Sequence, residues 1–497
     1  MDTGQRLRAI PGMDIILNSD WLGSYLEKLG RMRVKRIINK KLSQTRKNIL
    51  ENEEAEFNYD EFRDSCMLAF ASASRSSLTR VINATGVVIH TNLGRSLIAE
   101  GAIKSMNEIA GHYSNLEYDL KAGGRGQRNS HVEDLLCSLT GAESSLVVNN
   151  NAGAVLLALS ALAKDSEVVV SRGELVEIGG SFRIPDIMEL SGAKLIETGT
   201  TNRTHLYDYE RAITERTSML LKIHPSNFRI EGFTASPERK DLAKLAHKNN
   251  LIFMEDAGSG LLVNNEVLNL PANSNEITIK ACLEAGADLV TFSGDKILGG
   301  PQIGGIAGKK ILIDKIKKYP LARALRVDKV TLAAFEATLR LYASEAYDEI
   351  PTLRMIRCPL EDLKTSAENL ANILAAKLKD SEIKVIKVQD AVGGGSCPEI
   401  KLEGYGVSIK HKNFGAGYIQ KLLRNFEIPV LCGAREDEII IHVRTLLPPL
   451  KGEVAERSEA GGVIAKTKGE VAQRAGGVAL KDEEILIKYL EGILNNA

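Results

Sequence analysis

DLVTFSGDKILGGPQIGG, residues 288–305, is the stretch that decides the fold class of this 497-residue chain. Its apolar beginning predicts a buried strand, and Lys296 lies just past the expected end of that strand. Open α/β sheets bind their ligands beyond the carboxyl ends of the strands. A lysine among glycines and apolar residues can lose its proton and act as a nucleophilic amine. Lys296 is therefore the candidate catalytic residue, although most lysines near a turn are simply solvated.

Short apolar runs around this segment alternate with helical patterns, which predicts βαβ units and a mainly parallel sheet. We expect seven strands, at 145–148, 167–170, 194–197, 219–223, 251–254, 288–292 and 304–307. The pattern breaks near residues 351–359. Beyond it we expect helices at 367–378, 418–424 and 482–494 and strands at 385–388, 399–402 and 438–443. The predicted domains are a helical N-terminal domain with its linker at 1–80, a large α/β domain at 81–355 and a small α+β domain at 356–497.

The composition excludes several classes of protein. With 44% hydrophobic and 26% charged residues and no long apolar run, the chain lacks a membrane span and a secretory signal, so we expect a cytoplasmic protein. Six dispersed cysteines, without a CxxC pair or clustered histidines, argue against a disulfide framework and against a metal site. Lys and Arg together number 64, as do Asp and Glu, so any nucleic-acid surface must be local.

One local basic surface is visible in the sequence. Residues 28–47 contain nine basic residues and no acidic one. The apolar residues within this run recur at helical intervals, which predicts an amphipathic helix with a cationic face; they are Met32, Val34, Ile37, Ile38 and Leu42. This face could contact phosphates, or it could be a solvated face neutralised by the acidic stretch at 51–61. Charge alone favours the second interpretation.

Another segment looks foreign to the fold. KGEVAERSEAGGV at 451–463 is nearly repeated as KGEVAQRAGGVAL at 468–480. Two copies are too few to build a solenoid, and they contain few large apolar side chains. We expect the insertion at 451–480 to be a mobile excursion before the last helix.

Two further motifs would complete a site around Lys296. The strand expected at 251–254 leads to Asp256, a carboxylate that suits the protonated ring nitrogen of pyridoxal 5'-phosphate (PLP). Glu255 should point to the opposite side of the strand. NNNAG at 149–153 joins a strand to a helix, and open N–H groups at Asn151 and Ala152 could hold a phosphate, although an ordinary Asn-rich turn is as common.

Ser293 and His224 are weaker candidates for the same site. The Ser293 hydroxyl, three residues before the lysine, could donate to a cofactor phosphate. His224 follows another expected strand, where it could reach the same cleft, although a lone histidine is more often structural.

The order of phosphate cup, strand-end aspartate and Ser-x-x-Lys resembles the aspartate-aminotransferase-like PLP superfamily, fold type I. Longer stretches are similar to the bacterial selenocysteine synthases, the L-seryl-tRNA(Sec) selenium transferases: INATGVVIHTNLGRS at 82–96, GELVEIGGSFRIPDIM at 173–188, RALRVDKVTLAAFEATLRLY at 323–342 and GGGSCPE at 393–399. The resemblance covers nearly everything except the repeated insertion.

The resemblance implies that Lys296 binds PLP as a Schiff base. Seryl-tRNA(Sec) would then be converted to selenocysteyl-tRNA(Sec) through an aminoacrylate, with selenophosphate as selenium donor. Arg95, Arg323 and Arg326 would hold the selenophosphate, and Asp295 would protonate the departing hydroxyl. We expect Arg323 and Arg326 to lie on one face of a helix, because they are three residues apart.

The resemblance also gives the N-terminal basic helix a role in gripping tRNA. Its candidate contacts are Arg31, Arg33, Lys35, Arg36 and Lys40. Recognition of RNA shape and backbone should dominate there. The resemblance further implies a homo-oligomer, a homodecameric ring of dimers with active sites at subunit interfaces.

Two other functions stay open. A PLP-dependent β-eliminating lyase or desulfurase acting on a free amino acid would use the same lysine, but would have no need of the basic helix. A non-catalytic tRNA-binding protein that kept the fold would have no need of Lys296 or Asp256.

Overall fold

The computed structural model describes residues 2–52, 54–175, 177–178, 182–224, 230, 232–271, 276–446 and 482–495. The chain divides into two compact units, Met1–Arg80 and Val81–Ala497. The insertion expected at 451–480 lies outside the described residues. Within these ranges, no helix combines the length and the apolar character needed to cross a membrane.

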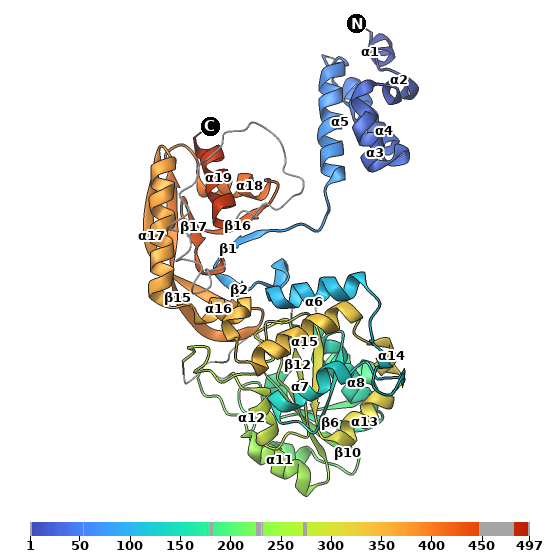
Figure 1. The fold of residues 1–497 in the computed structure, drawn as a ribbon, viewed down its shortest axis with the longest axis vertical. Helices are drawn as coiled ribbons and strands as arrows, with labels where there is room; N and C mark the ends of the chain where they lie inside the picture. The colour runs from blue at the N-terminus through green and yellow to red at the C-terminus, as the bar shows by residue number, and fades with distance from the viewer. Residues whose placement is uncertain are drawn as a thin grey trace. The chain divides into compact units, whose positions relative to one another are not determined.

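The first unit is helical (Figure 1). Its α-helices are α1 (Thr3–Arg8), α2 (Met13–Leu17), α3 (Gly23–Leu29), α4 (Arg31–Glu51) and α5 (Tyr59–Ser74). Gly30 separates α3 from α4 with a φ of 74°, a backbone conformation that glycine adopts without strain. Asn58 caps the start of α5, because its side chain accepts hydrogen bonds from free N–H groups in the first turn of the helix.

Helix α4 is the amphipathic helix that the sequence predicts. Val34, Ile38 and Leu42 are buried at four-residue spacing, against a cluster contributed by α2, α3 and α5. The assignment of Met32 to the apolar face is wrong, because 88% of that residue is exposed. A helix turns about 100° per residue, so Met32 lies about 200° around the axis from Val34.

A seven-stranded sheet lies at the centre of the larger part of the second unit. In spatial order its strands are β5 (Ser144–Val148), β13 (Gly304–Gly308), β12 (Leu289–Ser293), β11 (Ile252–Asp256), β10 (Thr217–Ile223), β6 (Glu167–Ser171) and β9 (Lys194–Thr198). From β12 to β9 all neighbours are parallel, and β13 pairs antiparallel with β12 and β5. The mainly parallel seven-stranded sheet is confirmed, and the carboxyl ends of β10, β11 and β12 meet at one edge.

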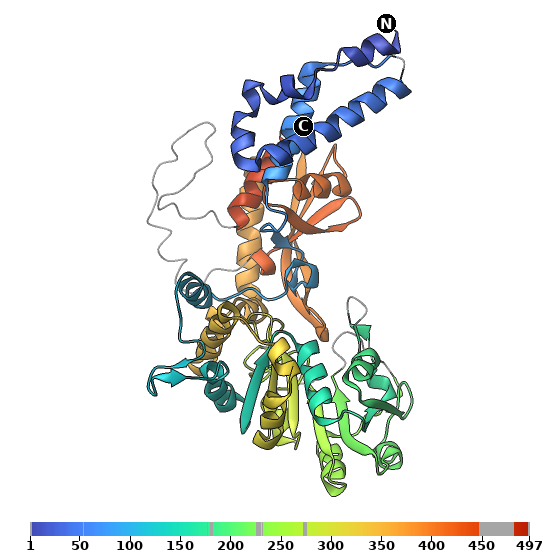
Figure 2. The same ribbon diagram turned by 90° about the vertical axis from the view of Figure 1, so that its right-hand side faces the viewer.

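Helices cover both faces of this sheet, as Figures 1 and 2 show. One face packs against α8 (Asn151–Leu162), α9 (Ile184–Ser191) and α13 (Lys310–Lys318). The other packs against α7 (Ser130–Thr140), α11 (Arg239–Lys248), α12 (Ile279–Glu284) and α15 (Lys329–Ala343). Inner strands such as β6 and β12 do not alternate between apolar and polar residues, because both of their faces are buried, whereas β9 at the edge of the sheet is partly exposed.

Shorter elements complete this part. They are α6 (Glu100–Gly111), α10 (Leu206–Ala212), α14 (Leu321–Ala324), α16 (Pro351–Arg357), the pair β3 (Tyr118–Asp119) and β4 (Gly124–Arg125), and the pair β7 (Glu177–Ile178) and β8 (Phe182–Arg183).

The C-terminal part of the second unit contains a six-stranded sheet. Its order is β1 (Ile82–Ala84), β16 (Val430–Arg435), β17 (Glu438–His442), β15 (Ser396–His411), β14 (Ser381–Gly393) and β2 (Val87–Ile89). Helices α17 (Leu360–Lys377), α18 (Ala416–Arg424) and α19 (Asp482–Leu494) share its apolar cluster. The three expected helices and three expected strands are present, whereas β16 was missed because Gly433 and Arg435 interrupt its apolar pattern.

Residues 82–89 belong to this smaller sheet, and not to the large domain in which the sequence analysis placed them. Strand β1 pairs in parallel with β16, and β2 with β14. Pairing between segments so distant in the chain leaves no local pattern in the sequence. The boundary expected at residue 355 stays a prediction.

A buried ion pair ties the small sheet to its surroundings. Arg444, 3% exposed, donates from Nε to Asp390 Oδ2 at 2.7 Å. Its other nitrogens donate to the carbonyl groups of Met355 and Glu403. His442 Nδ1 lies 2.7 Å from Asp390 Oδ1, so both carboxylate oxygens are held.

Candidate active site

Lys296 lies in the turn after β12, at the edge where the parallel strands end. It is buried, with 6% of the residue exposed. A Cβ atom built on Gly258 would lie 3.7 Å from Nζ, which places the amine beside the turn that follows β11. The pKa of Lys296 is lowered, chiefly by burial and also by the charge of Arg95, against the nearby carboxylates, Asp256 first among them, which raise it. These are the conditions under which a lysine amine becomes nucleophilic.

Asp256 ends β11 within the same site. Its Oδ1 accepts hydrogen bonds from Asn151 Nδ2 at 2.8 Å and from Thr291 Oγ1 at 2.9 Å. Oδ2 accepts none from the described residues. Burial raises the pKa of Asp256, against those two hydrogen bonds and the charges of Lys296 and His224. One carboxylate oxygen is thus fixed, and the other can accept from a bound group.

The residues around Asp256 separate onto the two faces of the sheet. Glu255 is fully buried on the opposite side, where Arg239 Nε donates to its Oε1 at 2.7 Å. His224 follows β10, and its backbone N–H donates to the carbonyl oxygen of Asp256 at 3.0 Å. The His224 ring is buried, with Nε2 4.0 Å from Glu276 Oε2. His224 is therefore joined to Asp256 through the backbone, and its role in cofactor binding stays a prediction.

The first turn of α8 contains backbone N–H groups that lack an acceptor among the described residues. The Asn150 side chain accepts from the Gly153 N–H at 2.8 Å. The N–H groups of Asn151 and Ala152 have no acceptor among the described residues. Asn151 Oδ1 is also buried without a partner. A helix start with free N–H groups suits an anion, while the Asn151 side chain serves Asp256.

Asp295 and Arg95 form an ion pair next to the lysine. Arg95 Nη1 lies 2.8 Å from Asp295 Oδ2, and Gln302 Nε2 lies 3.3 Å from the same oxygen. The Ser96 hydroxyl donates to the carbonyl oxygen of Lys296. The segment that precedes α6 is thus bound to the lysine turn. Ser293 is buried at the end of β12, and its hydroxyl has no partner among the described residues.

Arg323 and Arg326 do not share a helix, so that expectation is wrong. Helix α14, which contains Arg323, ends at Ala324, and Asp328 caps the start of α15. Between them the chain turns at Leu325, and Arg326 forms a β-bridge with Val148. The Asn149 N–H also donates to the carbonyl oxygen of Leu325 at 3.0 Å. This segment therefore lies beside the strand that leads into α8.

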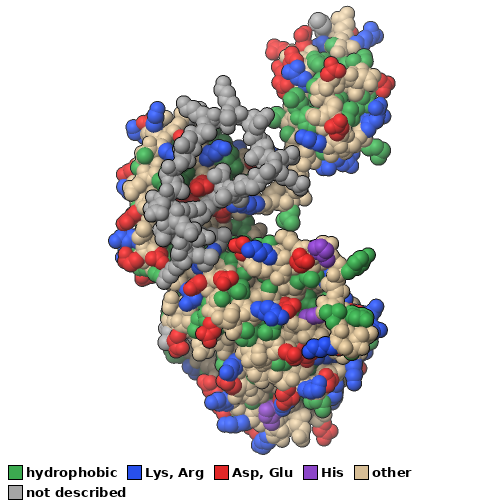
Figure 3. Space-filling view, viewed as in Figure 1, with side chains coloured by type: hydrophobic (Ala, Val, Ile, Leu, Met, Phe, Trp, Pro, Cys, Tyr) green, Lys and Arg blue, Asp and Glu red, His purple; other side chains and the backbone are tan. Residues whose placement is uncertain are grey.

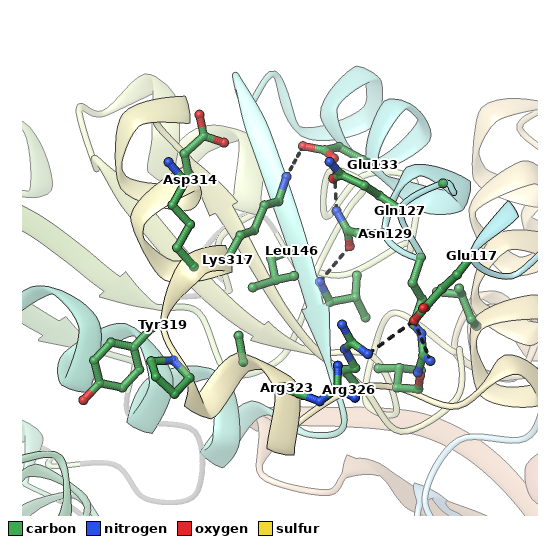
Figure 4. Close-up of a pocket in the computed structure, with 18 of the residues that line it drawn as sticks. Glu117, Gln127, Asn129, Glu133, Leu146, Asp314, Lys317, Tyr319, Arg323 and Arg326 are labelled. Carbon is green, nitrogen blue, oxygen red and sulfur yellow. Dashed lines mark hydrogen bonds and ion pairs between the residues drawn. The ribbon is translucent and has the colours of Figure 1, made fainter. Parts of the chain in front are cut away.

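Both arginines line a half-open cavity of about 770 Å³, shown in Figure 4. Glu117 Oε1 lies 3.3 Å from Arg326 Nη1 and 3.0 Å from Arg128 Nη2. Most of the charged side chains that line the cavity are basic, because the lining also includes Arg125, Lys310, Lys317 and Lys318. No described contact joins Arg323 or Arg326 to Arg95 within one chain.

The basic residues of α4 are available to a partner. Arg31, Arg33, Lys35, Arg36 and Lys40 are all exposed. None of these five forms an ion pair with a residue that the structure describes. Elsewhere in the same helix, Lys47 Nζ lies 3.7 Å from Glu51 Oε1. Neutralisation by the following acids is therefore not seen for these five. On the face of the second unit shown in Figure 3, basic and acidic side chains are interspersed.

Sequence reasoning missed several residues that the structure places in or next to the site: Thr291, Gln302, Ser96, Glu276 and Glu117. Thr291 lies inside a strand, where a threonine is usually read as packing. Its position two residues before Ser293, on the same side of β12, was the available signal. Glu276 and Glu117 lie in polar connecting segments that carry no motif.

The sheet, with a buried lysine and a buried aspartate at its carboxyl edge, defines the fold class of the PLP-dependent transferases, fold type I. A family model described as L-seryl-tRNA selenium transferase matches residues 81–447, and one described as selenocysteine synthase N terminal matches residues 7–46. The chain belongs to the L-seryl-tRNA selenium transferase family.

Individual relatives agree with this assignment. The chain is 46% identical over 448 residues to the L-seryl-tRNA(Sec) selenium transferase of Clostridium botulinum strain Loch Maree, covering 90% of this chain and 96% of that protein. It is 47% identical over 417 residues to the enzyme of the same name from Desulfotalea psychrophila, covering 83% and 89%. Among solved structures, D-glucosaminate-6-phosphate ammonia-lyase has a similar fold, with a TM-score of 0.52 at 20% identity, covering 76% of this chain and 94% of that chain.

Proposed function

We propose that this protein converts L-seryl-tRNA(Sec) to L-selenocysteyl-tRNA(Sec), with PLP bound at Lys296 and selenophosphate as the selenium donor. The observation that carries the proposal is a buried lysine with a lowered pKa beside Asp256, in a chain of this family. Lysine pKa values are lowered in this way where the amine must act as a nucleophile or a base.

The residues present fit PLP. Asp256 has an open carboxylate oxygen for the protonated ring nitrogen, and the N–H groups of Asn151 and Ala152 are free for the phosphate. Asn151 Oδ1 is buried and has no hydrogen-bond partner among the described residues, so it can accept a hydrogen bond from a polar group bound beside it. His224 and Ser293 lie at the same edge of the sheet and would complete the binding site. When bound, PLP supplies an electron sink at the α-carbon of the seryl group.

The residues of the chain then move the protons. With PLP held in the site, the Lys296 amine would take the proton from the seryl α-carbon and would return it at the end of the reaction. The seryl hydroxyl leaves the β-carbon as water, and the selenium of selenophosphate bonds to that carbon. Cleavage of the P–Se bond by water releases phosphate, and a proton returns to the α-carbon. Asp295 is the candidate donor to the departing hydroxyl. In this structure it holds Arg95, so donation would require that contact to open.

Selenophosphate requires cations that PLP does not use. Arg95, Arg323 and Arg326 are the candidates, because guanidinium groups stay charged and bind phosphate oxygens in a fork. Within one chain no described contact joins Arg95 to the other two. A homo-oligomer with sites at its subunit interfaces, such as a decameric ring of dimers, would let the three act together.

Helix α4 is the proposed tRNA-binding element, and its binding should depend on salt. Replacing Arg33, Arg36 and Lys40 together with alanine should reduce the slope of log affinity against log salt by about 2 to 3 units. Lys47→Ala is the matched control, because Lys47 is already paired with Glu51 and should leave the slope unchanged. Fluorescence anisotropy of labelled tRNA at several salt concentrations measures both. The substrate belongs to translation, which supports a cytoplasmic location.

The decisive test supplies purified protein with PLP, seryl-tRNA(Sec) and selenophosphate. Wild type should form selenocysteyl-tRNA, and Lys296→Ala should form none. Borohydride reduction followed by peptide mapping should find PLP on the peptide containing Lys296. Attachment elsewhere would refute the assignment. Turnover of free serine in place of the charged tRNA would instead favour a lyase.

A further inference from the structure

We propose that Glu276 is a positioning residue that links the tip of the β14–β15 hairpin to His224 in the site of Lys296. The proposal rests on the proposed function, because it assigns a residue to that same site. Glu276 belongs to no motif that the sequence or the family resemblance singled out.

The contacts of Glu276 reach two different parts of the second unit. Its side chain is buried, with 2% exposed. Oε1 accepts a hydrogen bond from the Cys397 N–H at 2.6 Å, and Oε2 lies 4.0 Å from His224 Nε2. Asn265 Nδ2 holds the backbone of Glu276 by donating to its carbonyl oxygen at 3.2 Å. One carboxylate therefore spans the hairpin and the histidine.

The hairpin tip holds the Cys397 N–H in a defined position. Gly393, Gly394 and Gly395 all have positive φ, and Cys397 itself has a φ of 47°, uncommon for a residue with a side chain. A Cβ on Gly393 would lie 2.8 Å from the Ile89 carbonyl oxygen, so the tip packs tightly against β2. Figures 1 and 2 show the long hairpin reaching toward the seven-stranded sheet. The N–H is thus a fixed donor for Glu276.

At its other end, Glu276 acts on the charges around the lysine. His224 is bound through its backbone to Asp256, and its charge affects that carboxylate. The charges that act on Lys296 are those of Asp256, Arg95, Asp295 and Glu276. Because one oxygen of Glu276 is fixed by the hairpin, the other is held 4.0 Å from the His224 ring, close enough for an electrostatic contact but longer than a hydrogen bond.

Two variants separate the two contacts. In Glu276→Gln the amide oxygen still accepts from the Cys397 N–H, but the negative charge is gone. In Glu276→Asp the charge remains, but the side chain is one methylene too short to span both partners. Asp288→Asn is the matched control. Asp288 is also a buried carboxylate that accepts a backbone N–H, from Phe253 at 2.8 Å, and contacts a histidine, but it lies at the opposite edge of the sheet.

Two measurements are made on each variant. In protein reconstituted with PLP, the pH midpoint of the cofactor's visible absorbance reports the charge near Lys296. Glu276→Gln should lower this midpoint by about 0.5–1 pH unit, because it removes one negative charge near a protonated nitrogen. Hydrogen exchange of a peptide spanning residues 393–402 reports the hairpin contact. It should be within twofold of wild type in Glu276→Gln and at least fivefold faster in Glu276→Asp.

Asp288→Asn should change neither measurement, although it should lower the melting temperature. An unchanged pH midpoint in Glu276→Gln would overturn the proposal. It would also be overturned if, in every variant, the pH midpoint and the exchange rate changed only in proportion to the loss of melting temperature. If Glu276→Gln does not fold, Glu276→Asp serves as the test. Faster hydrogen exchange at the hairpin tip, together with a pH midpoint within about 0.2 units of wild type, would support the linkage. Any other result would reject it. Wild type without a PLP absorbance band would refute the proposed function, while exchange in the apoprotein would still test the hairpin contact.

Discussion

Replacing Asp256 with asparagine tests the role of the strand-end carboxylate. The amide oxygen can take the place of Oδ1 and still accept from Asn151 and Thr291, at 2.8 and 2.9 Å in wild type. The amide nitrogen takes the place of Oδ2, so a donor replaces an acceptor where the ring nitrogen of PLP would lie. The substitution therefore removes one charge-assisted hydrogen bond and leaves the other contacts in place.

The size of the effect follows from that single lost bond. Hydrogen bonds to charged groups contribute about 1.5–3 kcal/mol, so Asp256→Asn should weaken PLP binding by about 10- to 150-fold. The rate of selenium transfer with saturating PLP should fall at least as much, because an unprotonated ring is a weaker electron sink. Titration of the apoprotein, followed by absorbance, gives the Kd.

Two controls make this result specific. Thr291→Val removes one of the two donors to Oδ1, so it should weaken PLP binding by only about fivefold. Asp288→Asn alters a buried carboxylate at the other edge of the sheet and should leave the Kd unchanged within twofold. An affinity for PLP in Asp256→Asn equal to that of wild type would refute the assignment. Equal weakening in Asp288→Asn would show a general loss of stability.

Three further outcomes are expected. In the apoprotein, Lys296→Met should be more stable than wild type at pH 7, and the difference should shrink as the pH rises toward 10.5. Because the pKa of Lys296 is lowered in the folded state, the folded protein binds fewer protons than the unfolded chain. The free-energy cost of burying the amine therefore disappears once the pH exceeds the pKa of the unfolded state. A difference in melting temperature that stays constant with pH in thermal scans would contradict this. Arg326→Ala should raise the KM for selenophosphate by about 10- to 100-fold with a smaller change in kcat, and steady-state kinetics with an unchanged KM would exclude the arginine from that site. Arg444→Leu should lower the free energy of unfolding by about 3–5 kcal/mol in urea, because Asp390 stays buried without its cation; a loss below about 1 kcal/mol would mean that water replaces the guanidinium.

The sequence was sufficient to predict the large sheet and its lysine. Its inner strands are buried on both faces, and the resulting apolar pattern is visible in runs such as 288–292. Asp256 could be placed because it lies two residues after such a run, at 251–254. Local patterns of this kind can be recognised in the sequence without knowing which distant residues are in contact.

Other features depend on contacts that no local pattern records. Residues 82–89 resemble any short apolar run, and only pairing with β16 and β14 places them in the small sheet. The spacing of Arg323 and Arg326 suggested one helix, but Asp328 caps a new helix start after them. Glu276 follows the stretch NSN at 273–275 and has the appearance of an ordinary loop residue. Its contacts with His224 and Cys397 exist only in the folded chain.

The pairing of Ile82 with Val430 has a consequence for synthesis of the protein. About 350 residues must be translated between these two partners, and at roughly 5–20 residues per second the first waits about 20–70 s for the second. During that time β1 and β2 leave the ribosome with bare backbone edges and apolar side chains. The small sheet can therefore form only when translation is nearly complete, and until then these edges are open to pairing with other chains.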